Sequence, residues 1–466
     1  MATSTTTPAR PPLQHDLPEG TVEWVEATAG GTVTRLYRHV ARREAWVVDI
    51  ERPDGGVVEG FLRIERDARP DNPWSLRKET EIVRALGPTP VPVPQVYGWD
   101  DQRSCALFER VRGRSDLDKV EDTGQQRAVY EHFIDVAAAL HTLDIDALAL
   151  PPMPRPTTPE ECALGELDLL LDEWRMFLAT YHDPLLTYGV QWLRRHVPPS
   201  VERVSLVQGD TGPVNFLFEG REVTAVIDWE WGHLGDPLED LGNICVREFW
   251  NPSGGLRGLF DRYARASGVP ADPAAVRYYR VQQQVRGMIP IHAVTVNAHP
   301  REPVAWYLAY RYVGDRATCE ALAEAMGIVV ARPEVPDDDG GDDVVARAAQ
   351  YALEHDIAPH LDDPLARSRA ADVGVLVACT ERRRRLGPAL AAVERDELGQ
   401  LLGRTPASVE DGFVALDAAI ADDRLDEASV VRYLTRRAYR DEWLWAPACA
   451  LYPSRAWAPI DEGASD

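Results

Sequence analysis

The chain has 466 residues, of which 45% are hydrophobic and 27% charged, and its formal net charge is -25. So acidic a chain is poorly suited to bind nucleic acid or an anionic membrane surface. No run of about 18 apolar residues occurs, so no membrane span is expected. The six cysteines form no CxxC pair, which argues against a zinc site or a disulfide framework and for a reducing, cytoplasmic location.

Composition divides the chain into five parts. Residues 1–20 are polar and proline-bearing without an apolar stretch, so we expect a disordered arm and not a signal peptide. Proline, glycine and acidic residues mark a linker at 331–343. Between these segments lie a β-rich part, 21–113, and a helical part, 114–330. Residues 344–462 alternate helical periods with short turns, which predicts a helical bundle.

The β-rich part opens with segments that alternate between apolar and polar residues. The first, 21–40, carries Gly30 and Gly31, which we place at a turn. The second, 45–65, contains two β-rich runs that meet at a turn over 53–56. The pattern predicts three strands with a glycine turn.

The segment 206–241 carries most of the candidate chemistry. Asp210 follows Gly209 in an irregular loop, and Asn215 lies five residues later. The run NFLFEGREVTAVID predicts a hairpin of two short strands, so Asn215 and Asp228 at its ends are expected side by side. An amide oxygen and a carboxylate suit a hard cation such as Mg²⁺, and a carboxylate like Asp210 can orient or deprotonate a hydroxyl.

Three motifs of this segment resemble those of the aminoglycoside phosphotransferase-like kinases, which are relatives of protein kinases. QGDTGPVN resembles their HGDxxxxN catalytic loop, IDWEW their metal-binding IDxE segment, and GDPLEDL their GDPxxDL helix start. The resemblance implies that Asp210 is the catalytic base and that Asn215 and Asp228 bind Mg²⁺. It also implies that Asp240 supports the loop from below. Gln208 stands where the family usually has histidine, and glutamine can still hydrogen-bond backbone groups.

The same resemblance implies that the β-rich part binds the nucleotide. A kinase needs a cation on its third strand, paired with a glutamate from the next helix. Arg63, in GFLRIE, is in register for this cation and resembles the VLR segment of acyl-CoA-dehydrogenase-associated phosphotransferases, with Glu79 as its partner. The alternative is a surface arginine and a solvated glutamate. Gly30 and Gly31 are expected over the phosphates, and the backbone from Glu109 to Val111 at the adenine edge.

The acceptor side and the C-terminal part carry weaker signals. Helices expected within 165–197 occupy the place where this family walls its acceptor pocket, and Glu230, Trp231 and His233 are expected to face the same cleft. The bundle after the linker resembles a small helical domain of unknown function found beside such phosphotransferases, and it can contact the kinase lobes. Its ERRRRL run, 381–386, is either an anion-binding patch or a solvated helix face.

Together these patterns predict an α+β chain: a two-lobed protein-kinase-like fold with a β-rich N-lobe and a helical C-lobe, plus a C-terminal all-α bundle. The predicted activity transfers the γ-phosphate of ATP, with Mg²⁺, to a hydroxyl of a small molecule, either a hydroxyacyl thioester or an aminoglycoside or other antibiotic. Two other classes stay open. One is a catalytically silent kinase fold used as a binding module, which Gln208 supports; the other is a metal-dependent phosphohydrolase, which would need a nucleophilic DxD strand.

Overall fold

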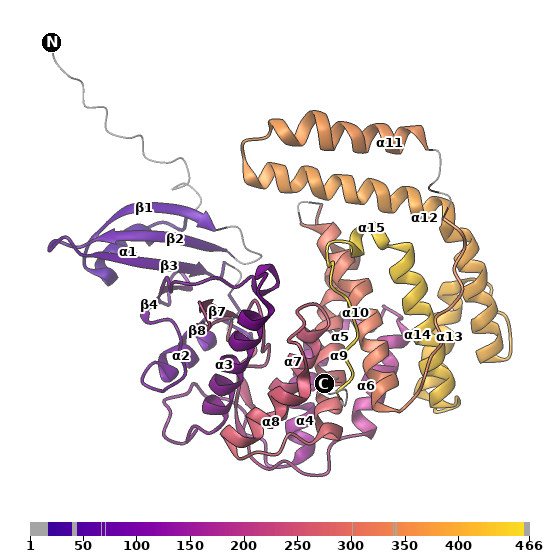
Figure 1. The fold of residues 1–466 in the computed structure, drawn as a ribbon, viewed down its shortest axis with the longest axis horizontal. Helices are drawn as coiled ribbons and strands as arrows, with labels where there is room; N and C mark the ends of the chain where they lie inside the picture. Colours follow the sequence, from indigo (N-terminus) through magenta and orange to yellow (C-terminus); the bar gives the residue numbers. More distant parts are fainter. Residues whose placement is uncertain are drawn as a thin grey trace. The chain divides into compact units, whose positions relative to one another are not determined.

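The computed structural model describes residues 17–39, 44–66, 68–69, 71–300, 302–338, 340 and 343–460 (Figure 1). Most of the predicted N-terminal arm lies outside these residues, as do three residues of the predicted linker. The chain divides into two compact units. The first unit runs to Pro154 and includes Ser205–Leu234, and the second contains Arg155–Val204 and the chain from Gly235 onward.

The first unit is built on a five-stranded antiparallel sheet with the order β1-β2-β3-β5-β4 (Figure 1). Its strands are β1 (Thr32–His39), β2 (Ala45–Glu51), β3 (Val57–Ile64), β4 (Val96–Asp100) and β5 (Cys105–Glu109). The sheet buries a core that includes Trp46, Val48 and Ile50 of β2 and Leu62 of β3. Three central strands are therefore held mainly by apolar burial.

Helix α1 (Thr21–Ala29) stands where the sequence predicted an alternating segment. Its buried residues, Thr21, Val25 and Ala29, are four positions apart. Residues at this spacing share one face of a helix, but they would also share one face of a strand, so a short run fits both patterns. Gly30 ends the helix in the left-handed conformation, with its N–H donating to the carbonyl of Glu26. The prediction of a strand over 21–29 is therefore wrong, and Gly30 and Gly31 follow the end of a helix.

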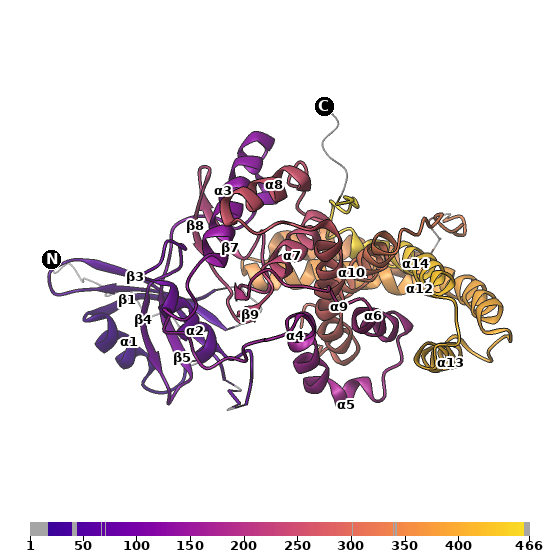
Figure 2. The ribbon, with the colours of Figure 1, turned by 90° about the horizontal axis from the view of Figure 1, so that it is seen from below.

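The rest of the first unit includes the 206–241 segment as far as Leu234. Its elements are α2 (Leu76–Leu86), a 3₁₀ turn (Leu117–Lys119), α3 (Thr123–His141), β6 (Ser205–Val207), β7 (Phe216–Glu219), β8 (Glu222–Val226) and β9 (His233–Gly235). Strands β7 and β8 form the predicted hairpin, in which Phe216 pairs with Val226. The hairpin lies beside α3 in both views (Figures 1 and 2), and the ring of Phe133 lies 4.5 Å from that of Phe216. Because this hairpin packs on α3, both belong to one unit with the sheet.

The second unit is helical. Its α-helices are α4 (Pro159–Glu173), α5 (Arg175–Leu178), α6 (Pro184–Arg195), α7 (Leu238–Glu248), α8 (Leu256–Ser267), α9 (Pro273–Asn297), α10 (Val304–Ala325), α11 (Val344–Tyr351), α12 (Pro364–Leu402), α13 (Val409–Ala421), α14 (Glu427–Leu444) and α15 (Ala446–Cys449). A π-helical turn (Ala352–Ile357) and a 3₁₀ turn (Ala358–His360) join α11 to α12.

The helices after residue 343 share their core with the helices before it. Ala309 of α10 is buried in one cluster with Cys379 of α12 and Ala448 of α15. The ring of Trp445 is stacked on that of Tyr312 with centroids 4.8 Å apart. The helices after residue 343 therefore belong to the same compact unit as α10, and they also pack on one another, since Leu398 of α12 and Leu416 of α13 are fully buried.

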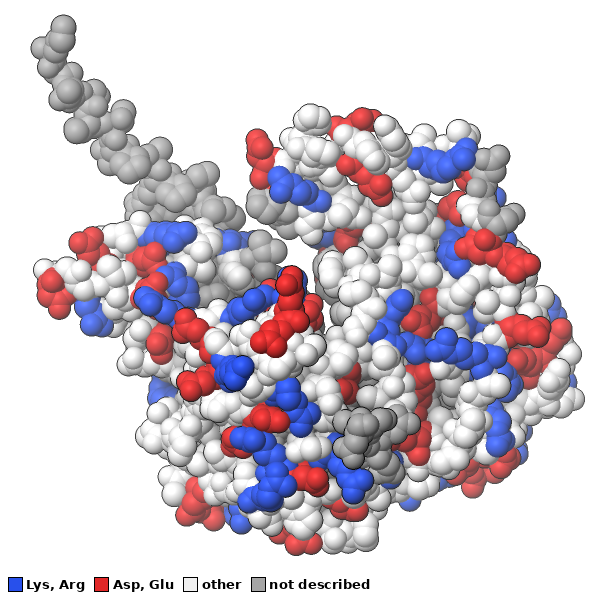
Figure 3. Space-filling model, viewed as in Figure 1, with Lys and Arg blue, Asp and Glu red and all other residues white. Residues whose placement is uncertain are grey.

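Basic and acidic side chains are interspersed on the face of the molecule seen in Figure 3. Neither sign gathers there into one large patch, although the chain as a whole carries many more acidic than basic residues. Within the described ranges, no helix combines the length and the apolar character needed to cross a bilayer.

Candidate active site

The loop between β6 and β7 holds Asp210 in a strained, closely packed backbone. Gly209 has φ 78°, and a Cβ there would lie 2.5 Å from the carbonyl oxygen of Trp231, so only glycine fits. Val214 has φ 77°, which is costly for a β-branched residue. Asp228 likewise has φ 63°. Such conformations persist where the surroundings enforce them, and they often mark functional sites.

Gln208 connects this loop to the segment that ends in Asp228. Its side-chain oxygen accepts a hydrogen bond from the N–H of Asp210 at 3.0 Å. Its Nε2 donates to the carbonyl oxygens of Ile227 at 3.1 Å and Asp228 at 2.9 Å. The side chain is 1% exposed. Glutamine therefore satisfies three partly buried backbone groups at the position where the resembling family carries histidine.

Asn215 binds Asp210 directly. Its Nδ2 donates to Oδ2 of Asp210 at 2.6 Å and to the Asp210 carbonyl at 2.7 Å. The N–H of Ile227 donates to the carbonyl of Asn215 at 2.9 Å, so the hairpin brings Asn215 beside the start of the Asp228 segment. With its amide nitrogen committed to Asp210, Asn215 keeps its side-chain oxygen as an acceptor.

Arg63 and Glu79 form a buried ion pair between β3 and α2. Nη1 of Arg63 lies 2.5 Å from Oε1 of Glu79 and 3.7 Å from Oδ1 of Asp228. The two paired side chains are 13% and 3% exposed, which excludes the alternative of a surface arginine and a solvated glutamate. Burial alone would lower the pKa of Arg63, but the carboxylates of Glu79 and Asp228 outweigh burial and raise it. The guanidinium stays charged beside Asp228.

Helix α2 places Glu79 at this position. The hydroxyl of Ser75 accepts from the N–H of Lys78 and caps the helix. Ile82 and Leu86 are buried on the same helix. The capped first turn and the apolar residues thereby fix the rotation of the helix, which presents Glu79 to Arg63.

The oxygen ligands of the site suit Mg²⁺. Asp228 offers a carboxylate that is 39% exposed, and Asn215 offers an amide oxygen. Mg²⁺ prefers such hard ligands and commonly takes one or two carboxylates together with phosphate oxygens and water. In the part of the chain that the structure describes, no cluster of three or more His, Cys, Asp and Glu side chains is placed to hold a metal. By their chemistry, the amide oxygen of Asn215 and the carboxylate of Asp228 fit such an ion.

The structure does not bring Gly30 and Gly31 to this site. Strand β1 starts at Thr32, which pairs with Glu51 at one end of the sheet. Arg63 pairs with Ala45 at the opposite end of β2. The predicted place of the two glycines over the phosphates is corrected for this reason.

The predicted adenine-binding linker follows β5. The N–H of Glu109 donates to the carbonyl of Gln95 at 2.8 Å, and the N–H of Arg110 donates to that of Glu59 at 2.9 Å. Val111 is partly buried just beyond the strand. Glu109 pairs with Gly60, three positions before Arg63 along β3, so the linker leaves the same sheet that carries the arginine.

Two of the predicted acceptor residues are buried. Glu230 is 3% and His233 5% exposed, and Nδ1 of His233 lies 2.9 Å from the carbonyl of Trp231. Trp231 is partly buried and its ring lies 5.0 Å from that of Trp74. Trp74 lies in the loop before α2, and no local sequence pattern singles it out, because only the fold brings the two tryptophans together.

Asp240 belongs to the second unit, in the first turn of α7, and its side chain is fully buried. Its neighbour Glu239 is also fully buried and is paired with Arg286 of α9 at 2.8 Å. Oδ1 of Asp236 accepts from the N–H of Leu238, the first residue of α7, at 2.9 Å. The acidic residues of GDPLEDL are thus held in the interior of their unit.

The fold is shared with a solved structure. A crystal structure from Ralstonia eutropha JMP134, of a protein provisionally assigned as an aminoglycoside phosphotransferase, is 21% identical and superposes with a TM-score of 0.50. The match covers 62% of this chain and 91% of that one. The chain therefore has the predicted α+β, two-lobed kinase-like fold, with C-terminal helices added to it.

Residues 28–279, more than half of the chain, match the model of the phosphotransferase enzyme family. The chain belongs to this family. It is also 27% identical over 285 residues to mouse acyl-CoA dehydrogenase family member 10, a match that covers 58% of this chain and 24% of the relative. It is 28% identical over 353 residues to the probable acyl-CoA dehydrogenase IBR3 of Arabidopsis thaliana, covering 66% of this chain and 39% of that protein. The chain thus spans well under half the length of these two relatives.

Proposed function

We propose that the chain is an ATP-dependent O-phosphotransferase that transfers the γ-phosphate to a hydroxyl of a small molecule. The observation that carries the proposal is one connected set of contacts. Gln208 bonds the backbones of Asp210 and Asp228, Asn215 bonds Asp210, and Arg63 lies between Glu79 and Asp228. A cation, a metal-ligand pair and a carboxylate base thereby lie within one unit of the chain.

Each residue has a role in this proposal. Asp210, half-buried and fixed through Asn215, orients the acceptor hydroxyl and takes its proton. Arg63 binds phosphate oxygens of the nucleotide. Asn215 and Asp228 hold Mg²⁺, which when bound would neutralise phosphate charge. The linker backbone from Glu109 to Val111 receives the adenine.

For the acceptor, we propose a hydroxyacyl thioester. The support is the likeness to proteins that are named acyl-CoA dehydrogenases, with which this chain shares only part of their length. An aminoglycoside or another antibiotic is the alternative, which the name of the solved relative favours. We further propose that the protein works in the cytoplasm without nucleic acid or membrane as partner.

Phosphoryl transfer to a panel of hydroxyacyl-CoA compounds and aminoglycosides tests the proposal. With ATP and Mg²⁺, the wild type should form ADP and a phosphorylated acceptor, while Asp210→Asn should lose about 100-fold or more in kcat and still bind ATP. The matched control is Asp118→Asn, at an exposed aspartate of the same unit, which should keep wild-type turnover. Equal turnover of Asp210→Asn and wild type would reassign the base.

The silent binding module remains the proposal of another class. It predicts binding of ATP, seen as a thermal shift, with no ADP formed on any acceptor. The structure offers it little support, because Gln208 supplies the backbone contacts whose loss would be the reason to expect inactivity. Absence of any nucleotide-dependent thermal shift would count against both proposals.

A further inference from the structure

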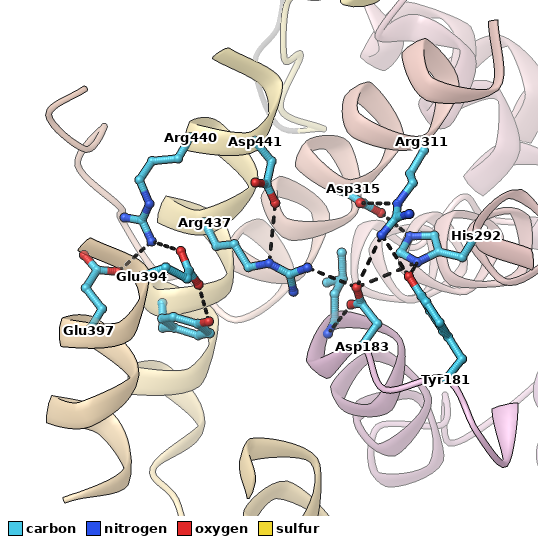
Figure 4. Close-up of polar contacts among 12 residues, drawn as sticks. Tyr181, Asp183, His292, Arg311, Asp315, Glu394, Glu397, Arg437, Arg440 and Asp441 are labelled. Atoms are coloured by element: carbon cyan, nitrogen blue, oxygen red, sulfur yellow. Dashed lines mark hydrogen bonds and ion pairs between the residues drawn. The ribbon is translucent and has the colours of Figure 1, made fainter. Parts of the chain in front are cut away.

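An ionic cluster is buried among the helices of the second unit (Figure 4). Oδ2 of Asp183, at the start of α6, lies 3.1 Å from Nη2 of Arg437 on α14 and 3.9 Å from Nη2 of Arg311 on α10. Nε2 of His292 on α9 lies 2.7 Å from Oδ1 of Asp315 on α10. Carboxylates and cationic groups compensate one another's burial here, so the cluster holds helices together. In the first unit, by contrast, a chain of contacts leads from the sheet to the candidate active site.

Glu65, just after β3, is the first member of this chain. Its Oε2 accepts a hydrogen bond from the N–H of Leu76, the first residue of α2, at 3.1 Å. Its Oε1 accepts from Nδ2 of Asn72 at 3.0 Å. Oδ1 of Asn72 in turn accepts from the N–H of Trp74 at 3.1 Å. Glu65 thus fixes the start of α2 and the backbone at Trp74 relative to the strand that carries Arg63.

The ring of Trp74 packs against the ring of Trp231, which follows Asp228 by three residues. The ring centroids are 5.0 Å apart and the rings are inclined by 44°. Both residues are partly buried. An aromatic pair at this distance is attractive beyond the burial of its apolar area. The pair therefore joins the loop before α2 to the segment that follows the candidate metal ligand Asp228.

The backbone of Trp231 packs against the loop of Asp210. At Gly209, the residue before Asp210, a Cβ would lie 2.5 Å from the carbonyl oxygen of Trp231 and 3.0 Å from its Cβ. The same carbonyl oxygen lies 2.9 Å from Nδ1 of His233. Because the two backbones are in such close contact, the position of Trp231 determines where the loop before Asp210 can lie.

A second contact joins the same segment to α2. Gly232 follows Trp231, and a Cβ on Gly232 would lie 3.0 Å from Cδ1 of Ile82. Ile82 lies on α2 and is fully buried. The segment after Asp228 thus contacts the loop before α2 through Trp74 and the helix itself through Ile82.

We propose that four residues form an aromatic clasp that positions Asp210 for phosphoryl transfer: Glu65, Asn72, Trp74 and Trp231. They are positioning residues, because they act on Asp210 through Gly209. The clasp rests on the proposed phosphotransferase function and adds to it the residues that hold the base in place. It ties the loop of Asp210 to the strand and helix that carry Arg63 and Glu79.

Turnover depends on how Asp210 lies relative to the groups that hold the nucleotide. Asp210 lies on the loop between β6 and β7, whereas Arg63 lies on β3 and is paired with Glu79 of α2. A displacement of about 1 Å at a reacting group can lower turnover about 100-fold. The clasp should therefore act on kcat more than on ATP binding, since the proposed ligands of ATP are not among its members.

The kinetics of Trp74→Leu, with ATP, Mg²⁺ and the acceptor found in the hydroxyacyl-CoA and aminoglycoside panel, test the clasp. The kcat should fall at least about tenfold, with the KM for ATP within about threefold of wild type. Trp74→Phe keeps an aromatic ring and should recover most of kcat. The matched control is Trp99→Leu, at a partly buried tryptophan of β4 whose Nε1 donates to Asp101, and it should keep wild-type turnover.

The two tryptophans should act as one unit. Trp231→Leu and the double variant with Trp74→Leu should lose kcat by the same factor as Trp74→Leu alone, because either substitution opens the clasp. The exciton couplet of the two stacked indoles in circular dichroism should be present in wild type and absent from all three variants. Losses of kcat that multiply in the double variant would overturn the proposal. So would a wild-type kcat in a Trp74→Leu protein that has lost the couplet.

Hydrogen exchange separates the clasp from the proposed function. The amides of 208–215, among which those of Asp210 and Asn215 are hydrogen-bonded, should exchange at least about tenfold faster in Trp74→Leu than in wild type. This result is expected whether or not any acceptor is phosphorylated, so an inactive wild type overturns the proposed function alone. Unchanged exchange of 208–215 overturns the clasp even in an active enzyme. If Trp74→Leu does not fold, Asn72→Ala replaces it, since it removes two hydrogen bonds of the clasp and should change exchange and kcat in the same direction.

Discussion

Gln208 is the residue that joins the loop of Asp210 to the segment that ends in Asp228. Because the resembling kinases have histidine at this position, Gln208 supported the alternative of a catalytically silent fold. In the structure, however, glutamine has three backbone partners. Glutamine can serve because its amide both donates and accepts, which the contacts with Asp210, Ile227 and Asp228 require. The role of the substitution is therefore a question of hydrogen-bond geometry rather than of proton transfer.

Gln208→Leu keeps a similar size and removes all three hydrogen bonds. We expect a loss of about 1–3 kcal/mol of unfolding free energy, because backbone groups are left buried without partners. Turnover should fall with it, while Gln208→His should retain more of both. The matched control is Gln125→Leu, which removes one exposed hydrogen bond to Gly220. Urea unfolding checks this, and an unchanged midpoint for Gln208→Leu would contradict the bridging role.

At the scale of elements, β3 and α2 are joined by the Arg63–Glu79 pair. The resemblance to kinases, which pair a cation on the third strand with a glutamate of the next helix, predicted the two residues as partners. Sequence could not establish that the pair is buried, because burial depends on the sheet and on the segment that ends in Asp228. Buried pairs are costly to break but can be replaced by apolar groups.

Because replacing both partners costs less stability than removing one, the effect of the pair on folding can be measured apart from its proposed role in nucleotide binding. Glu79→Ala should cost about 3–5 kcal/mol of unfolding free energy, since it leaves a buried guanidinium with less compensation. The double variant Arg63→Met with Glu79→Met should recover most of that stability. It should nevertheless lose the thermal shift produced by ATP and Mg²⁺, as measured by calorimetry. An ATP shift equal to that of wild type in the double variant would remove Arg63 from the nucleotide site.

At the scale of the whole molecule, the helices after residue 343 are part of the second unit. Ala309, Val313 and Ala317 of α10 are buried in clusters that also contain Cys379 or Cys449. The composition of the linker at 331–343 indicated a boundary, yet composition reports only how the chain is solvated locally. The apolar faces of helices on either side decide whether they form one core or two.

A chain that ends after Asp343 should therefore be poorly folded in its second unit. Removal of the following helices exposes apolar side chains of α10 to water, which weakens burial over its whole length. We expect a lower melting temperature by circular dichroism and binding of a hydrophobic dye. A truncated chain with an unchanged melting temperature and no dye binding would show that the bundle is separable.

The sequence by itself determined which residues are candidates for the proposed chemistry and in what order they occur. Asp210, Asn215, Asp228, Arg63 and Glu79 could be found because loop, hairpin and helix signals are local, and the family motifs sit on them. Helix α1 and the place of Gly30 and Gly31 were missed, because a nine-residue run fits two periodicities until it packs on a sheet.

Only the tertiary structure decided how Gln208 substitutes for histidine, how Trp74 meets Trp231, and how Asp183 gathers groups from α9, α10 and α14. These contacts join residues far apart in the chain, and no local pattern specifies them. Their physical basis is the need of buried polar groups for partners, which is met only when the helices and strands have assembled.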